Sequence, residues 1–101
     1  MAFEVTFKDA SLEKLERDAS YSGGYDAAIV KAFRKRMQLI RSATDERDFF
    51  ALRSLNFERL KGNRQHQFSM RLNDQWRLIL EIEGEGPGNK KLLIVGIEDY
   101  H

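Results

Sequence analysis

The sequence predicts an α+β fold in which an N-terminal strand and two helices pack on a mostly antiparallel sheet. Apolar residues alternate at the start of the chain, recur at helical spacing over residues 10–42, and return to a period of two after residue 55. This order of strand, helices and then several strands is typical of helices covering one face of a sheet. With 101 residues, we expect a single domain over residues 1–101.

The N-terminal half contains the predicted strand and helices. The strand places Phe3, Val5 and Phe7 on one face. A short helix follows, capped by Asp9 or Ser11 and ending at Ser22–Gly24. Its apolar stripe consists of Leu12, Leu15 and Ala19.

The second helix is predicted to begin after Asp26 and to bury one face. The apolar positions at helical spacing are Ile29, Val30, Phe33, Met37 and Ile40. A break and a short helical turn starting near Thr44 follow it.

The C-terminal half is predicted to form strands. Leu55 and Phe57 indicate a strand that ends near a turn at residues 61–63. Residues 68–82 indicate a hairpin, and residues 84–89 are rich in glycine and indicate a loop. Residues 92–97 are apolar on both faces, as expected for a strand inside the sheet.

The register of the hairpin follows from its alternation, because a shift by one residue would turn the apolar face of a strand outward. A three-residue loop at residues 73–75 sets Leu72 opposite Trp76 and therefore Arg71 opposite Arg77, on the face away from the core. Like charges in this position repel each other. The pair is either a surface charge cluster, with Glu81 available to neutralise it, or a clamp for phosphate.

Composition excludes several kinds of chemistry. The chain has no cysteine, so it has no disulfide, no thiol nucleophile and no cysteine-ligated zinc. Two histidines are too few for a histidine-rich metal site, so we expect no cofactor and a catalysis that either needs no metal or holds one with carboxylates alone. The charged N-terminus does not resemble a signal peptide, and the longest apolar run is too short to cross a membrane, so we expect a cytoplasmic protein.

The net charge is only +1, but basic residues are concentrated in the middle of the chain. Residues 58–78 contain five arginine or lysine residues against two acidic ones. A basic stretch of this kind suits a polyanionic partner, although a solvated surface explains it equally well.

Three motifs in the C-terminal half resemble one family. They are Leu60-Lys61-Gly62-Asn63-Arg64, then Ser69 to Arg77 with the sequence SMRLNDQWR, then the terminal Glu98-Asp99-Tyr100-His101. Together and in this order they resemble the HigB branch of the RelE-like toxins. The resemblance covers the C-terminal half strongly and the N-terminal half in layout only.

The resemblance implies a RelE-like, microbial-RNase-like α+β fold and a toxin of a type II toxin–antitoxin system. Such toxins cleave messenger RNA in the ribosomal A site without a metal, and a HigA-like DNA-binding antitoxin neutralises them. The resulting complex is expected to bind operator DNA. A non-catalytic module that binds RNA or a partner on the same scaffold is the alternative.

The resemblance also assigns the site residues. Arg77 matches the catalytic arginine, and Asp99, Tyr100 and His101 match the terminal catalytic motif. Glu58 stands where the family has a histidine, so either Glu58 or Asp99 is expected to be the base or to orient His101. Contacts with RNA phosphates are expected from Lys61, Arg64 and Arg71.

Overall fold

The computed structural model describes residues 3–84 and 90–99. The predicted loop at residues 84–89 therefore lies outside the described residues except for Gly84, and so do Tyr100 and His101. The elements are β1 (Glu4–Phe7), α1 (Ala10–Arg17), α2 (Ala27–Ser42), α3 (Arg47–Ala51), the 3₁₀ turn η1 (Arg53–Leu55), β2 (Glu58–Arg59), the 3₁₀ turn η2 (Gly62–Arg64), β3 (Gln67–Arg71), β4 (Trp76–Glu83) and β5 (Lys91–Asp99).

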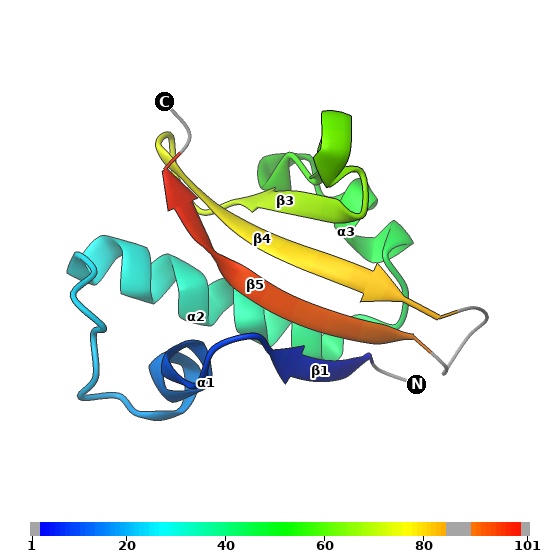
Figure 1. Cartoon of the computed structure of the whole chain (residues 1–101). Helices are drawn as coiled ribbons and strands as arrows, with labels where there is room; N and C mark the ends of the chain where they lie inside the picture. The colour runs from blue at the N-terminus through cyan, green and yellow to red at the C-terminus, as the bar shows by residue number, and fades with distance from the viewer. Residues whose placement is uncertain (1–2, 85–89, 100–101) are drawn as a thin grey trace.

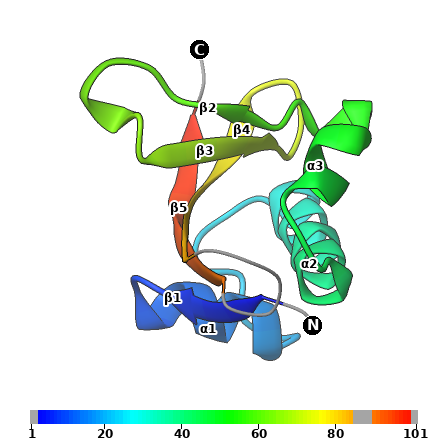
Figure 2. The same cartoon turned by 90° about the vertical axis from the view of Figure 1, so that its right-hand side faces the viewer.

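The strands form one sheet in the order β1-β5-β4-β3-β2 (Figures 1 and 2). β1 runs parallel to β5 at one edge, and the other neighbouring strands are antiparallel. The predicted fold class is therefore confirmed, including the mostly antiparallel sheet.

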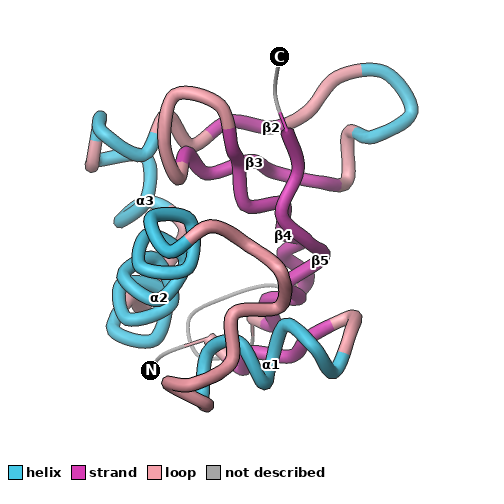
Figure 3. The backbone as a smooth tube through the Cα atoms, turned by 90° about the vertical axis from the view of Figure 1, so that its left-hand side faces the viewer, coloured by secondary structure: helices cyan, strands magenta, loops and turns pink. Residues whose placement is uncertain are grey.

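The helices cover one face of this sheet. The sheet curves around α2 (Figure 2), and α1 packs beside α2 near β1 (Figure 3). The apolar face of α2 is buried as predicted, and Phe33, Met37 and Ile40 are fully inaccessible to solvent. These side chains pack in one core with the inward-facing residues of the strands, among them Phe68, Met70, Leu78, Leu80, Leu92 and Ile94.

The first helix ends earlier than the sequence predicts. It is capped by Asp9, whose carboxylate accepts a hydrogen bond from the backbone amide of Ser11, but it stops at Arg17. Arg34 on α2 donates hydrogen bonds to the carbonyl oxygens of Leu15 and Asp18, and to that of Tyr21 in the following segment. This guanidinium satisfies carbonyl groups that a longer helix would have paired internally.

The predicted strand around Leu55 and Phe57 is largely wrong. Leu55 is buried within η1, and only Glu58 and Arg59 form β2. Asn56 between them has a φ of 44°, in the left-handed region, and ends the 3₁₀ turn. The turn redirects the chain so that Glu58 pairs with Ser69 of β3.

A β-bulge divides β5 into two segments. Ile79 pairs with Gly96 but the next residue, Leu80, pairs with Ile94, so Val95 is the extra residue. The bulge reverses which alternate residues face the helices. Leu92 and Ile94 face the core before the bulge, whereas Ile97 packs against it afterwards.

Within residues 3–84 and 90–99, none of the helices combines the length and the apolar character that a membrane span requires.

Candidate functional site

The hairpin has the predicted register. Arg71 on β3 and Arg77 on β4 are direct cross-strand partners, and the amide of Leu72 donates to the carbonyl oxygen of Trp76. The loop is held by Asn73, whose side-chain oxygen accepts hydrogen bonds from the amides of Gln75 and Trp76. The two arginines therefore lie side by side on the sheet face away from the helices.

Each arginine has its own acidic neighbour. Arg71 is paired with Asp74 of the hairpin loop. Arg77 donates through Nη2 to the carbonyl oxygen of Asn56, and the same nitrogen lies 3.9 Å from Oε1 of Glu58. The sequence suggested that Glu81 could neutralise this arginine pair. In the structure, the carboxylate of Glu81 instead accepts a hydrogen bond from Gln67.

A pocket of about 290 Å³ opens between these groups. It is lined by Asn56, Arg71, Asn73, Asp74 and Arg77. Only 11% of the Arg77 side chain is exposed, whereas 61% of the Glu58 side chain is exposed. The pocket thus has a nearly buried cation in its wall and an accessible carboxylate close by, which together can hold an anion and accept a proton.

Arg36 connects this site to the helical layer. Its Nε donates to the carbonyl oxygen of Arg71 at 2.8 Å. Burial lowers the pKa of Arg36, and the nearby charge of Arg71 lowers it further. The helix α2 therefore fixes the end of β3 from which the Arg71 side chain projects.

The structure also describes three other residues that were expected in the site. Lys61 is exposed before η2. Arg64 forms a bidentate pair with Glu98, with distances of 3.0 and 2.7 Å. Asp99 lies opposite Trp76, and its carboxylate accepts a hydrogen bond from the side chain of Gln75.

Sequence reasoning missed the positions of Glu98 and Asn56. Glu98 is the direct cross-strand partner of Arg77 because the bulge at Val95 shifts the alternation of β5 by one residue. The adjacent Gly96 is the only local signal for such a bulge. Asn56 enters the site through its backbone carbonyl, which no side-chain motif reveals.

The hydroxyl of Ser69 lies on the same side of β3 as Arg71. Ser69 is fully buried, and its Oγ has no hydrogen-bond partner among the described residues. Gln67 and Ile79 on this face are buried as well, so the face away from the helices is not the solvated surface that alternation alone predicts.

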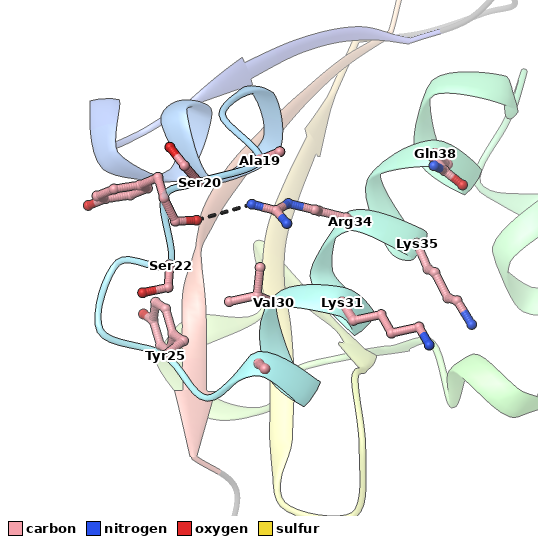
Figure 4. A pocket seen from close by; sticks show the side chains of 11 residues that line it. Ala19, Ser20, Ser22, Tyr25, Val30, Lys31, Arg34, Lys35 and Gln38 are labelled. Atoms are coloured by element: carbon pink, nitrogen blue, oxygen red, sulfur yellow. Dashed lines mark hydrogen bonds between the residues drawn. The ribbon is translucent and has the colours of Figure 1, made fainter.

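A second and larger pocket, of about 490 Å³, lies on the helical side of the molecule (Figure 4). It lies between α2 and the segment that joins α1 to α2, and Figure 4 shows Arg34 reaching across to that segment. Lys31 and Lys35 line its rim. Because this pocket and the arginine pair are on opposite sides of the sheet, the pocket is not part of the same site.

Among residues 3–84 and 90–99, no group of three or more histidine, cysteine or acidic side chains is arranged to hold a metal ion.

Several solved structures share this fold. The YoeB/ParE toxin from Agrobacterium tumefaciens has a TM-score of 0.65 and 15% identity, and the match covers 98% of this chain and all of the toxin chain. A chain of the YoeB-YefM complex from Staphylococcus aureus has a TM-score of 0.59 and 20% identity, with coverage of 100% and 99%. The chain therefore has the fold of the YoeB- and ParE-type toxins.

The sequence identifies the family within this fold. Residues 5–94 match the profile of the family described as the RelE-like toxin of the type II toxin-antitoxin system HigB. The chain belongs to this family of HigB-like toxins. No curated protein sequence matches it significantly.

Proposed function

We propose that this HigB-like toxin is a ribosome-dependent endoribonuclease that cleaves messenger RNA in the A site and so inhibits translation. One arrangement carries the proposal: Arg77 lies beside Arg71 and 3.9 Å from the carboxylate of Glu58, at the edge of a pocket. Cleavage of an RNA phosphodiester without a metal requires a base, a group that stabilises charge on the phosphate and an acid, and this arrangement offers the first two.

The reaction requires two proton transfers and the stabilisation of negative charge. The 2′-hydroxyl loses a proton and attacks the adjacent phosphorus, charge accumulates on the phosphate oxygens, and the 5′-oxygen gains a proton as it leaves. We assign the base to Glu58, because its carboxylate is accessible and next to Arg77. Arg77 stabilises the charged phosphorane-like transition state.

The terminal motif supplies the remaining groups in this proposal. His101 is the acid that protonates the 5′-oxygen, since histidine titrates near neutral pH. Tyr100 stacks on a base or binds the phosphate. Asp99 orients His101, a role supported by its place at the end of β5 in the strand register.

Flanking phosphates are bound by the basic residues around the pocket. Arg71 lines the pocket directly, and Lys61 is exposed in the segment that follows β2. Arg64 is on the same side of the sheet, where its guanidinium is held by Glu98. Together they supply the positive field that a messenger RNA strand requires.

We further propose a HigA-like antitoxin as the partner. One of the similar structures is a complex of the toxin YoeB with YefM. The antitoxin would neutralise the toxin, and the complex would bind operator DNA. The site of action, on ribosomes and messenger RNA, is the cytoplasm.

The experiment is cleavage in a reconstituted translation system. Ribosomes paused on a defined message receive the toxin, and the new RNA ends are mapped by primer extension. The proposal requires ends within the A-site codon, none on the same RNA without ribosomes, and protection by the protein encoded next to the toxin gene. Intact message in the presence of paused ribosomes contradicts it.

A further inference from the structure

Ser69 on β3 carries a hydroxyl group that has no part in the reaction proposed above. Its side chain is fully inaccessible to solvent, and its Oγ has no hydrogen-bond partner among the described residues. A buried hydroxyl without a partner is unfavourable, because it has lost its bonds to water and gained none in exchange. Gln67, which is also buried on this face, is bonded through both atoms of its amide. Ser69 is therefore an exception to the rule that buried polar groups are paired.

The register of the sheet places Ser69 between the two groups to which we assign the chemistry. Ser69 pairs with Glu58 of β2. Arg71, the next residue of β3 on the same face, pairs with Arg77 of β4. All four side chains therefore project from the face away from the helices.

The contact between Glu58 and Arg77 crosses over β3. This strand lies between β2 and β4, so the backbones of the two residues are about 9–10 Å apart. Even so, Oε1 of Glu58 lies 3.9 Å from Nη2 of Arg77. The two side chains therefore meet above β3, and Ser69 is the residue of β3 directly opposite Glu58.

Ser69 can influence RNA only through another residue. The side chain of Glu58 is 61% exposed, whereas Ser69 has no accessible surface. A substrate in the pocket can thus reach the carboxylate of Glu58 but not the hydroxyl beneath it. The hydroxyl can donate one hydrogen bond, and a carboxylate is the strongest kind of acceptor in a protein.

We infer that Ser69 is a positioning residue, which donates a hydrogen bond to the carboxylate of Glu58 when RNA occupies the site. The inference rests on the proposed function, in which Glu58 is the base. A phosphate bound by Arg77 displaces the carboxylate from that contact, and the carboxylate turns toward the donor opposite it on the sheet. With one oxygen held by Ser69, the other faces the 2′-hydroxyl and accepts its proton.

The first test measures cleavage and stability in one variant. Ser69→Ala removes a hydroxyl that has no partner in the free protein, so the melting temperature should equal or exceed that of the wild type. On paused ribosomes, kcat should fall about 10- to 100-fold, the usual effect of losing a hydrogen bond to a charged group. KM should not change, because Ser69 does not reach RNA. A wild-type kcat, or a melting temperature well below that of the wild type, overturns the inference.

A double mutant shows whether Ser69 acts through Glu58. Glu58→Gln lacks the base, so adding Ser69→Ala in the same chain should cause no further loss of kcat. A residue that serves only the fold would lower the rate by the same factor in both backgrounds. Equal losses therefore overturn the inference.

Ser42 provides the matched control in the helical layer. It is the last residue of α2, and its hydroxyl donates to the carbonyl oxygen of Leu39 at 2.9 Å. Ser42→Ala should cleave at the wild-type rate. A fall in kcat equal to that of Ser69→Ala would mean that the loss is not specific to the site, and would overturn the inference.

A second readout does not depend on cleavage. The hydroxyl proton of Ser69 is followed by NMR while a short RNA is added whose 2′-O-methyl groups prevent its cleavage. A bond to a carboxylate moves this resonance downfield, so we expect the change in the wild type and not in Glu58→Ala. The same response in both proteins overturns the inference. A wild-type toxin that shows the Glu58-dependent change but leaves A-site codons intact refutes the proposed function alone.

Discussion

Arg71 and Arg77 lie directly opposite each other on adjacent antiparallel strands, and both remain within reach of one pocket. Two guanidinium groups in this position repel each other unless anions stand between or beside them. Asp74 and Glu58 provide part of that compensation. A phosphate group bound in the pocket can neutralise both guanidinium groups.

Replacing Arg71 tests its contact with RNA. Arg71→Gln should weaken binding of a short RNA and lower the dependence of log affinity on log salt by about one unit, since one phosphate contact is lost. The measurement is fluorescence anisotropy over a range of salt concentrations. Arg17→Gln, at the end of α1, is the control and should leave the salt dependence unchanged. Equal slopes for wild type and Arg71→Gln would remove Arg71 from the RNA-binding surface.

Replacing Glu58 tests the base. Glu58→Gln keeps the shape of the side chain but cannot accept the proton, so kcat should fall by about 10²- to 10⁴-fold while RNA affinity changes little. Single-turnover cleavage on ribosomes measures this effect. Glu83→Gln alters an exposed glutamate at the far end of β4 and serves as the control. A kcat unaffected by Glu58→Gln would assign the base to another group.

Replacing Phe33 tests the position of the hydrophobic core. This ring is fully buried where α2 meets the sheet, so Phe33→Ala should lower the free energy of unfolding by about 3–5 kcal/mol. Urea denaturation measures the change. Phe50 is largely exposed and forms an edge contact with Phe57, so Phe50→Ala should cost about 1 kcal/mol or less. Similar losses for both variants would contradict the position of the core.

Asp45 makes the stability depend on pH. A hydrogen bond from the backbone amide of Arg47 holds its pKa below the usual value, and contacts with Glu46 and Lys90 lower it further. Because the folded protein binds this proton less readily than the unfolded chain, the stabilisation is present above about pH 4 and is lost as the pH falls.

Removing that carboxylate provides the check. Asp45→Asn should flatten the decrease in stability below about pH 4, because no proton binds there in either state. Urea midpoints between pH 2 and 6 (roughly the range in which aspartate titrates) measure this change. An unchanged acid dependence would show that the stabilising contacts of Asp45 do not persist in solution.

The alternation of apolar residues was sufficient to predict the register of the hairpin, but it did not predict the register of β5. A loop of three residues and two apolar faces allow one register, so the position of Arg71 against Arg77 could be derived from the sequence. The bulge at Val95 shifts the register of β5 by one residue, and it decides that Glu98 rather than Ile97 lies opposite Arg77. No alternation pattern contains that information.

The approach of Glu58 to Arg77 also could not be predicted from a local sequence pattern. It requires η1 and the left-handed Asn56 to bring β2 to the edge of β3. The sequence predicted a longer strand here because Leu55 and Phe57 have the spacing of a strand. Both side chains are buried, but Leu55 is buried from a 3₁₀ turn.

The most direct test of the central claim is the rate of A-site cleavage by Arg77→Gln on paused ribosomes. Glutamine can still donate to the carbonyl oxygen of Asn56, so the variant should fold, with a melting temperature close to that of the wild type. We predict a loss of about 10²- to 10³-fold in kcat, the usual cost of removing one group that stabilises transition-state charge. Cleavage at the wild-type rate by the folded variant would contradict the assignment of Arg77 as the catalytic cation.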